Sequence, residues 1–295
     1  DLRSANKRTL EGIATAGGFD LFGIYRSQYF EKIKDITYIE QMIRFGNKVQ
    51  DKQNSNQVDM FGDAAEASLQ APIAPNYNPW TNMQMLSKEK EVVGIYISGH
   101  PLDDYKFEIK NFCNSEISVL RDLDILRGKE ITFAGVVTLV EHKTGKNGKP
   151  YGVLYLEDYH ENFRFFIFGD EYIRFKAFFT EGWLLFVKGK VQKRPYNEDE
   201  LEFRIHDIQL LAELVDKEVR NIVMELDLND INDQLIKKIT DATNKNSGKH
   251  SLIIQINNNQ KKYALELLSR NRKLNIDNEF IQEVEKIAEV GLKIT

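Results

Sequence analysis

A lysine-rich stretch is the first place where the sequence indicates contact with another molecule. Residues 143–149 read Lys-Thr-Gly-Lys-Asn-Gly-Lys, with three lysines and no acidic residue. Lysines at this density suit contact with phosphate groups. The glycine spacing differs from that of a Walker A loop, and no Gly-Lys-Ser/Thr follows. We therefore predict that Lys143, Lys146 and Lys149 contact nucleic acid; a plain solvated hairpin loop is the alternative.

Aromatic residues and an arginine alternate with other residues just beyond this stretch. The set is Tyr151, Tyr155, Arg164, Phe166 and Phe168. Alternation brings side chains to one face of a strand, where exposed rings can stack on the bases of a single strand. Of these residues, we assign Tyr151, Arg164 and Phe166 to nucleic-acid binding. The alternative is that the rings form an ordinary barrel core.

Asp122 and Asp124 are the candidates for metal-dependent catalysis. Nucleotidyl transfer needs carboxylates on adjoining strands that together hold two Mg²⁺ ions. This pair lies in a connector ahead of the predicted strands, without a third carboxylate in a matching context. We predict no catalytic residue in this chain.

The histidines and the single cysteine do not form a recognisable site. His100 follows a helical stretch with no nucleophile or carboxylate beside it, so local packing is the preferred interpretation. The other histidines lack ligand spacing, and one cysteine allows neither an internal disulfide nor a multi-cysteine zinc site. We predict no metal and no cofactor for this chain.

The lysines and the rings fall within residues 126–211, where apolar residues recur at the two-residue period of strands. Three strands precede a helical segment at Asp170–Phe179, and two more follow at Trp183–Gln192 and Glu200–Leu211. This order predicts a five-stranded OB-fold barrel. An SH3-like barrel would not usually place a helix between its third and fourth strands.

Charge limits how this barrel could bind nucleic acid. Residues 128–211 contain 12 basic and 13 acidic residues, and the whole chain has a formal net charge of −5. Such a balance excludes a protein that coats nucleic acid by global electrostatics. Any contact must be local and its affinity modest.

The N-terminal part divides into three predicted segments. Residues 1–45 are expected to be helical, with a second helix beginning near Ser27. Residues 46–79 are polar and aperiodic and contain prolines, which predicts a flexible linker. Residues 80–125 form a predicted helical connector, whose helix should end at Gly99.

Residues 212–295 alternate between strand and helix patterns, which predicts a small α+β domain. The fold class is therefore multidomain α+β, with a helical N-terminal segment, an OB-fold barrel and this C-terminal domain. No run of apolar residues is long enough to span a membrane, and one cysteine fits the reducing cytoplasm. The start at Asp1, without Met or an apolar signal core, predicts a piece of a longer protein.

The predicted linker contains one apolar island. Its residues are Gln57, Val58, Asp59, Met60 and Phe61. They resemble the short peptide that binds the bacterial sliding clamp, in which Gln, any residue, Ser or Asp, Leu or Met, and Phe follow one another. A groove binder needs one hydrogen-bonding anchor and large apolar side chains that fill pockets, as Gln57, Met60 and Phe61 provide.

Other segments resemble one particular protein family. Asn6-Lys7-Arg8, residues 16–20 (Ala-Gly-Gly-Phe-Asp) and residues 94–102 (Gly-Ile-Tyr-Ile-Ser-Gly-His-Pro-Leu) occur in the order seen in the bacterial DNA polymerase III alpha subunit. Gly18 departs from the alanine usual at that place. The resemblance covers residues 1–211 well and 212–295 weakly.

This resemblance implies a C-terminal fragment of a replicative polymerase, a nucleotidyltransferase whose Mg²⁺-dependent core lies outside the chain. It implies that residues 1–45 are the end of the helix-hairpin-helix duplex-binding region. The implied partners are the sliding clamp (beta subunit), single-stranded DNA and the clamp-loader subunit tau. Two alternatives stay open: an OB-fold appendage of another enzyme such as a tRNA synthetase, and a free-standing single-strand-binding protein.

Overall fold

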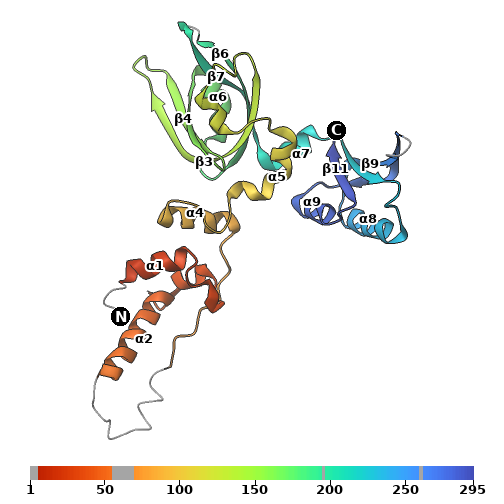
Figure 1. Cartoon of the computed structure of the whole chain (residues 1–295). Helices are drawn as coiled ribbons and strands as arrows, with labels where there is room; N and C mark the ends of the chain where they lie inside the picture. Colours follow the sequence, from red (N-terminus) through yellow and green to blue (C-terminus); the bar gives the residue numbers. More distant parts are fainter. Residues whose placement is uncertain (1–5, 55–69, 195–196, 259–261) are drawn as a thin grey trace. The chain divides into compact units, whose positions relative to one another are not determined.

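A computed structural model describes residues 6–54, 70–194, 197–258 and 262–295 (Figure 1). The chain forms two compact units, Asp1–Pro101 and Leu102–Thr295. The first unit contains helices and a two-stranded hairpin, and the second contains a five-stranded and a four-stranded sheet with their helices. The mixed α+β fold class predicted from the sequence is confirmed.

The first unit begins with α1 (Lys7–Thr15), whose N-terminus is capped by the side chain of Asn6. The helix predicted from about Ser27 is wrong in its first half. A short 3-10 helix, Arg26–Phe30, is followed by the hairpin β1 (Lys32–Ile33) and β2 (Ile36–Thr37). Lys34 and Asp35 both have positive φ, at 53° and 66°, and so form the tight turn between these strands.

The helix α2 spans Tyr38–Asn54 and therefore runs into the segment predicted as a linker from residue 46. Its first turn buries Tyr38 and Ile39 against Ala14 and Tyr29. A helix anchored in this way continues through polar turns, because no proline follows until Pro72. The sequence pattern missed this because polar residues 46–54 lack an apolar face of their own.

The helix α4 spans Asn82–Val93, and a capping box of Thr81 and Gln84 fixes its start. It ends at Gly94, which has a φ of 89°, so the predicted end at Gly99 is wrong. The chain beyond it is held by the buried Glu89 carboxylate, which accepts hydrogen bonds from the amides of Ile97 (3.0 Å) and Ser98 (2.9 Å).

In the second unit, α5 (Lys106–Phe112) precedes the barrel. Its strands are β3 (Glu130–Thr144), β4 (Pro150–Glu157), β5 (Asn162–Phe168), β6 (Leu184–Arg194) and β7 (Asn197–Leu210). They are hydrogen-bonded in the order β5-β4-β3-β6-β7, all antiparallel. The helix α6 (Gly169–Phe175) lies between the third and fourth barrel strands in sequence. This is the arrangement of an OB fold, as predicted.

The barrel core consists of side chains from the inner face of every strand, among them Phe133, Leu154, Phe165 and Leu185. The helix α6 contributes Tyr172, which packs beside Phe179 over Gly152. A Cβ atom at position 152 would lie 2.3 Å from the Phe179 ring, so only glycine lets the helical segment approach β4 this closely.

The C-terminal part begins with α7 (Leu211–Glu218), a helix that the sequence pattern did not reveal. A sheet in the order β10-β9-β8-β11 follows, formed by β8 (Asn221–Asp227), β9 (Ser247–Asn258), β10 (Tyr263–Leu274) and β11 (Val290–Ile294). The helices α8 (Asp233–Lys245) and α9 (Asn278–Glu285) bury Leu235, Ile239 and Phe280 against Ile222 and Met224 of β8. Among the described residues, no helix is both long and apolar enough to cross a membrane.

Candidate nucleic-acid interface

The lysine-rich stretch forms the hairpin loop between β3 and β4. Thr144 pairs with Pro150 at the ends of the strands, and the Gly145 amide donates to the Lys149 carbonyl at 2.9 Å. Gly148 has a φ of 72°, which closes the turn. The loop exposes Lys146 and Lys149 at its tip. It can therefore present two cations to a bound phosphate chain.

Lys143 differs from the other two lysines because it already has an anionic partner. It stands on β3, two residues from Glu141 and on the same face, and its ammonium group lies 2.8 Å from the Glu141 carboxylate. The hydrogen bond to Glu141 raises the pKa of Lys143. The sequence assigned equal roles to three lysines, whereas the structure leaves Lys146 and Lys149 as the stronger candidates.

The predicted rings come together on the outer face of β4 and β5. Tyr151 lies opposite Phe168 in the strand register, and Tyr155 lies opposite Arg164. Alternate residues of the same strands, including Leu154 and Phe165, point into the core, which fixes the outward direction of the row. Phe166 and Phe168 are 49% and 58% exposed, so these rings are not core.

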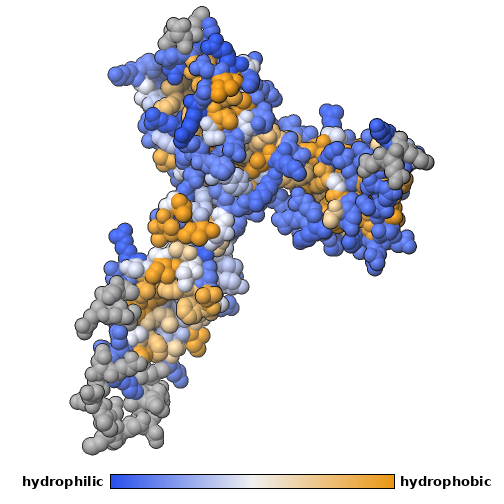
Figure 2. Space-filling model, viewed as in Figure 1, coloured by the Kyte–Doolittle hydropathy of each residue, from blue (hydrophilic) through white to orange (hydrophobic). Residues whose placement is uncertain are grey.

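The outward side chains form one continuous row of flat groups. The rings of Tyr151 and Phe168 are 5.1 Å apart, and those of Phe168 and Phe166 are 6.4 Å apart with planes only 10° from parallel. The Arg164 guanidinium lies 5.3 Å from the centre of the Phe166 ring. We call Tyr151, Phe168, Phe166 and Arg164 the aromatic row. Figure 2 shows a group of hydrophobic residues exposed among the hydrophilic surface of the barrel.

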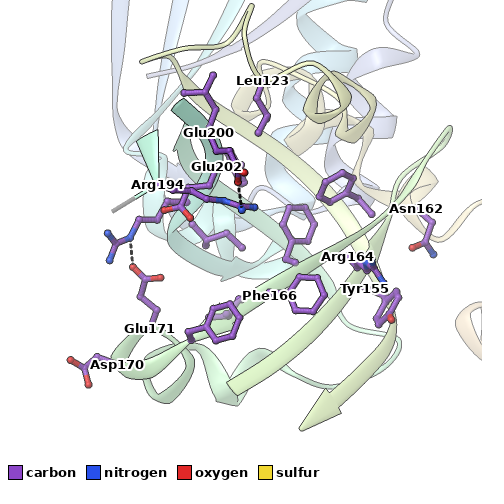
Figure 3. Close-up of a pocket in the computed structure, with 18 residues that line it drawn as sticks. Leu123, Tyr155, Asn162, Arg164, Phe166, Asp170, Glu171, Arg194, Glu200 and Glu202 are labelled. Atoms are coloured by element: carbon purple, nitrogen blue, oxygen red, sulfur yellow. Dashed lines mark hydrogen bonds and ion pairs between the residues drawn. The ribbon is translucent and has the colours of Figure 1, made fainter. Parts of the chain in front are cut away.

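A cleft of about 1350 Å³ lies between β5 and β7, and Arg164, Phe166 and Phe168 of the aromatic row form part of its lining (Figure 3). Arg194, Glu200, Glu202 and Arg204 line it from the β6–β7 side, and β5 lines the other. Two ion pairs cross or border it, Arg194–Glu200 and Arg204–Glu171. We call this the seam cleft. The sequence did not predict it, because it depends on which strand edges are left unpaired.

The residues rejected as catalytic have structural partners. Asp122 accepts a hydrogen bond from the amide of Asp124 in a turn before β3, and Asp124 lies 3.6 Å from Arg127. The His100 ring packs edge-on against Tyr96 at 5.0 Å. Local packing of His100 was the preferred interpretation of the sequence.

The five residues of the clamp-like peptide, Gln57–Phe61, lie outside the described residues. Their assignment stays a prediction.

Comparison with known proteins adds two family matches. Residues 131–211 match the family described as an OB-fold nucleic acid binding domain. Residues 222–295 match the family described as the DNA polymerase III alpha subunit, C-terminal domain. The DNA polymerase III subunit alpha of Escherichia coli strain K12 is 26% identical over 243 residues, 81% of this chain and 20% of that protein. Residues 222–295 thus carry the C-terminal domain of the DNA polymerase III alpha subunit family, and the chain is similar to alpha subunits over most of its length.

Two further alpha subunits extend this comparison. That of Borreliella burgdorferi is 27% identical over 281 residues, covering 91% of this chain and 23% of the relative. That of Saccharopolyspora erythraea is 30% identical over 201 residues, which cover 65% of this chain and 16% of the relative. The chain thus spans about a fifth of the length of the alpha subunits it matches. The family match at 222–295 covers the part in which the motif resemblance was weakest.

Proposed function

We propose that this chain is the part of a bacterial replicative polymerase that holds DNA and the processivity machinery, and that its barrel binds single-stranded DNA. The aromatic row carries this proposal. Three outward rings and an arginine plane are arranged so that successive bases can stack on them, and every base has a face suited to such stacking. The lysines at the loop tip are placed next to β4, where they would contact the phosphates.

The barrel's charge sets the expected strength of this contact. With 13 acidic against 12 basic residues in positions 128–211, the barrel has no general attraction for phosphate. Binding should therefore depend on stacking in the aromatic row and on two or three local cations. Such a site suits a domain that holds a template strand while other parts of a larger protein bind the duplex.

Fluorescence anisotropy with a labelled oligothymidylate tests the proposal. Phe166→Ala and Phe168→Ala should each weaken binding by about 5-fold to 150-fold, the range for losing one stacked base. Ile173→Ala is the matched control, since Ile173 is 68% exposed on α6 and lies outside the row. Equal affinities for all four proteins would place the DNA contact elsewhere. An oligouridylate of the same length measures the preference for RNA that an RNA-binding appendage would show.

We also propose that Gln57–Phe61 bind the sliding clamp. The order of residue types and the similarity to alpha subunits support this proposal. A weak peptide contact gains strength when the same chain also holds DNA, because the second binding event becomes intramolecular. The test is a pull-down with the clamp, comparing the wild-type chain with Phe61→Ala.

The remaining assignments concern the longer protein and its assembly. We propose that the full-length protein is a DNA-directed DNA polymerase, with Mg²⁺ bound outside this chain, and that residues 212–295 dock the clamp-loader subunit tau. The family of residues 222–295 supports the second assignment. Titration of this chain with purified tau, and with the chain ending at residue 211 as the comparison, tests it.

A further inference from the structure

The seam cleft shares Arg164, Phe166 and Phe168 with the aromatic row, but it also has an unpaired strand edge that base stacking does not use. In the described residues, β5 pairs only with β4, and β7 pairs only with β6. The sheet therefore does not close between β5 and β7. In an antiparallel strand, alternate residues direct their N–H and C=O groups to each side, so the outer edge of β5 presents a row of these groups to the cleft.

The interior of the seam is closed by side chains instead of backbone hydrogen bonds. Phe203 of β7 packs against Phe165 of β5, with ring centres 6.1 Å apart, and against Phe133 at 5.8 Å. Phe163 also lines the cleft. The cleft thus has an apolar floor and an unpaired strand edge, which are the two features of a site for strand addition.

The charges around the cleft indicate what kind of strand would fit. Within each of the ion pairs Arg194–Glu200 and Arg204–Glu171, the two opposite charges cancel. Asp170 and Glu202 also line the cleft, and within the described parts of the chain neither has a cationic partner. Figure 3 shows the Glu171, Glu200 and Glu202 carboxylates around the opening. Arg164 also lines the cleft, so its lining holds four carboxylates and three guanidinium groups, and the excess negative charge lies with Asp170 and Glu202.

We propose that the seam cleft binds an extended polypeptide segment in which basic residues alternate with apolar ones, added as a strand along the outer edge of β5. Apolar side chains of the segment face the Phe163 and Phe203 floor, and basic side chains face Asp170 and Glu202. Backbone hydrogen bonds to β5 hold the segment in register. This inference does not rest on the proposed DNA contact.

The test uses the folded chain and a defined probe, the peptide acetyl-Lys-Val-Lys-Phe-Lys-Val-Lys-amide, which has the length of β5. Labelled peptide should bind at least about tenfold more tightly than the same peptide with Glu in place of Lys. Hydrogen exchange should slow at the amides of Asn162–Phe168 when the peptide is bound. Methylating alternate peptide nitrogens on the side that faces β5 should abolish binding, because those donors are then lost.

Variants at residues that the two surfaces do not share distinguish peptide binding from DNA binding. Glu202→Lys should weaken peptide binding by about fivefold or less for each contact removed. The same change should leave the affinity for oligothymidylate unchanged or raise it. Tyr151 lies outside the cleft, so Tyr151→Ala should weaken oligothymidylate binding and leave peptide binding unchanged. Equal binding of basic and acidic peptides, or protection outside residues 162–168, would each overturn the proposal.

Discussion

Replacing both Lys146 and Lys149 with glutamine should flatten the salt dependence of single-stranded DNA binding in a predictable way. Both lysines are exposed at the tip of the β3–β4 loop. Each phosphate contact on a single strand contributes about 0.7 to the slope of log affinity against log salt. Losing two contacts should therefore lower the slope by about 1.4.

The same relation gives the loss of affinity. If the proteins converge at about 1 M salt, the double variant should bind about 65-fold more weakly at about 50 mM and about tenfold more weakly at about 200 mM. Anisotropy titrations over this range measure both quantities. Lys237→Gln with Lys238→Gln on α8 removes the same charge from another domain and should leave the slope unchanged.

The Glu141–Lys143 pair makes this prediction sharper, because only the change at Glu141 should alter the slope. Lys143 is held 2.8 Å from Glu141, so Lys143→Gln should change the slope little. Glu141→Gln should instead release Lys143 to a phosphate, raising the slope by up to about 0.7 and increasing affinity. An unchanged slope in the Lys146 and Lys149 variant, or weaker binding by Glu141→Gln, would refute this account of the loop.

Three further predictions concern other parts of the chain. Phe61→Ala should weaken clamp binding by about thirtyfold, the effect of losing a buried aromatic anchor, whereas Val58→Ala should change it little; a pull-down or titration in which both variants bind like wild type contradicts the clamp assignment. The chain should incorporate no nucleotide on primed template with Mg²⁺, since Asp122 and Asp124 lie in a turn, and primer extension by the rigorously purified chain would contradict this. Burial raises the pKa of Glu108, so the folded state keeps a proton that the unfolded state releases as the pH rises above about 4.3, and stability is lost over that rise. Glu108→Met should therefore stabilise the chain by roughly 1–3 kcal/mol at about pH 8 and by less at about pH 4 in urea unfolding, unlike the exposed control Glu181→Met; a destabilised variant at both pH values would show that the carboxyl group has a favourable partner.

The barrel and its row were predictable from the sequence because both follow from the two-residue period of strands. That period alone puts Tyr151, Arg164 and Phe166 on one face and Phe165 on the other. The period could not tell which rings are exposed and which are buried, because the residues are chemically alike: Phe163, Phe165, Phe166 and Phe168. Their burial depends on which face of the sheet becomes the inside of the barrel. The exposed fractions of Phe166 and Phe168 required the structure.

Other features were missed for identifiable physical reasons. The helix α7 and the strand β11 are too short for apolar residues to recur often enough to reveal a helical or strand period. The end of α4 depends on the left-handed conformation of Gly94, one of several glycines that could have ended it. The seam cleft depends on pairing between strands distant in sequence, which no local pattern records.

Photocross-linking of a 5-iododeoxyuridine oligonucleotide to this chain, followed by mapping of the linked peptides, tests the central claim most directly. Iodouracil links to aromatic side chains on which it stacks, so the account predicts links at Tyr151, Phe166 or Phe168, and their loss when the linked ring is changed to alanine. Efficient links confined to the C-terminal domain or to the first unit, with the aromatic row unmarked, would contradict it.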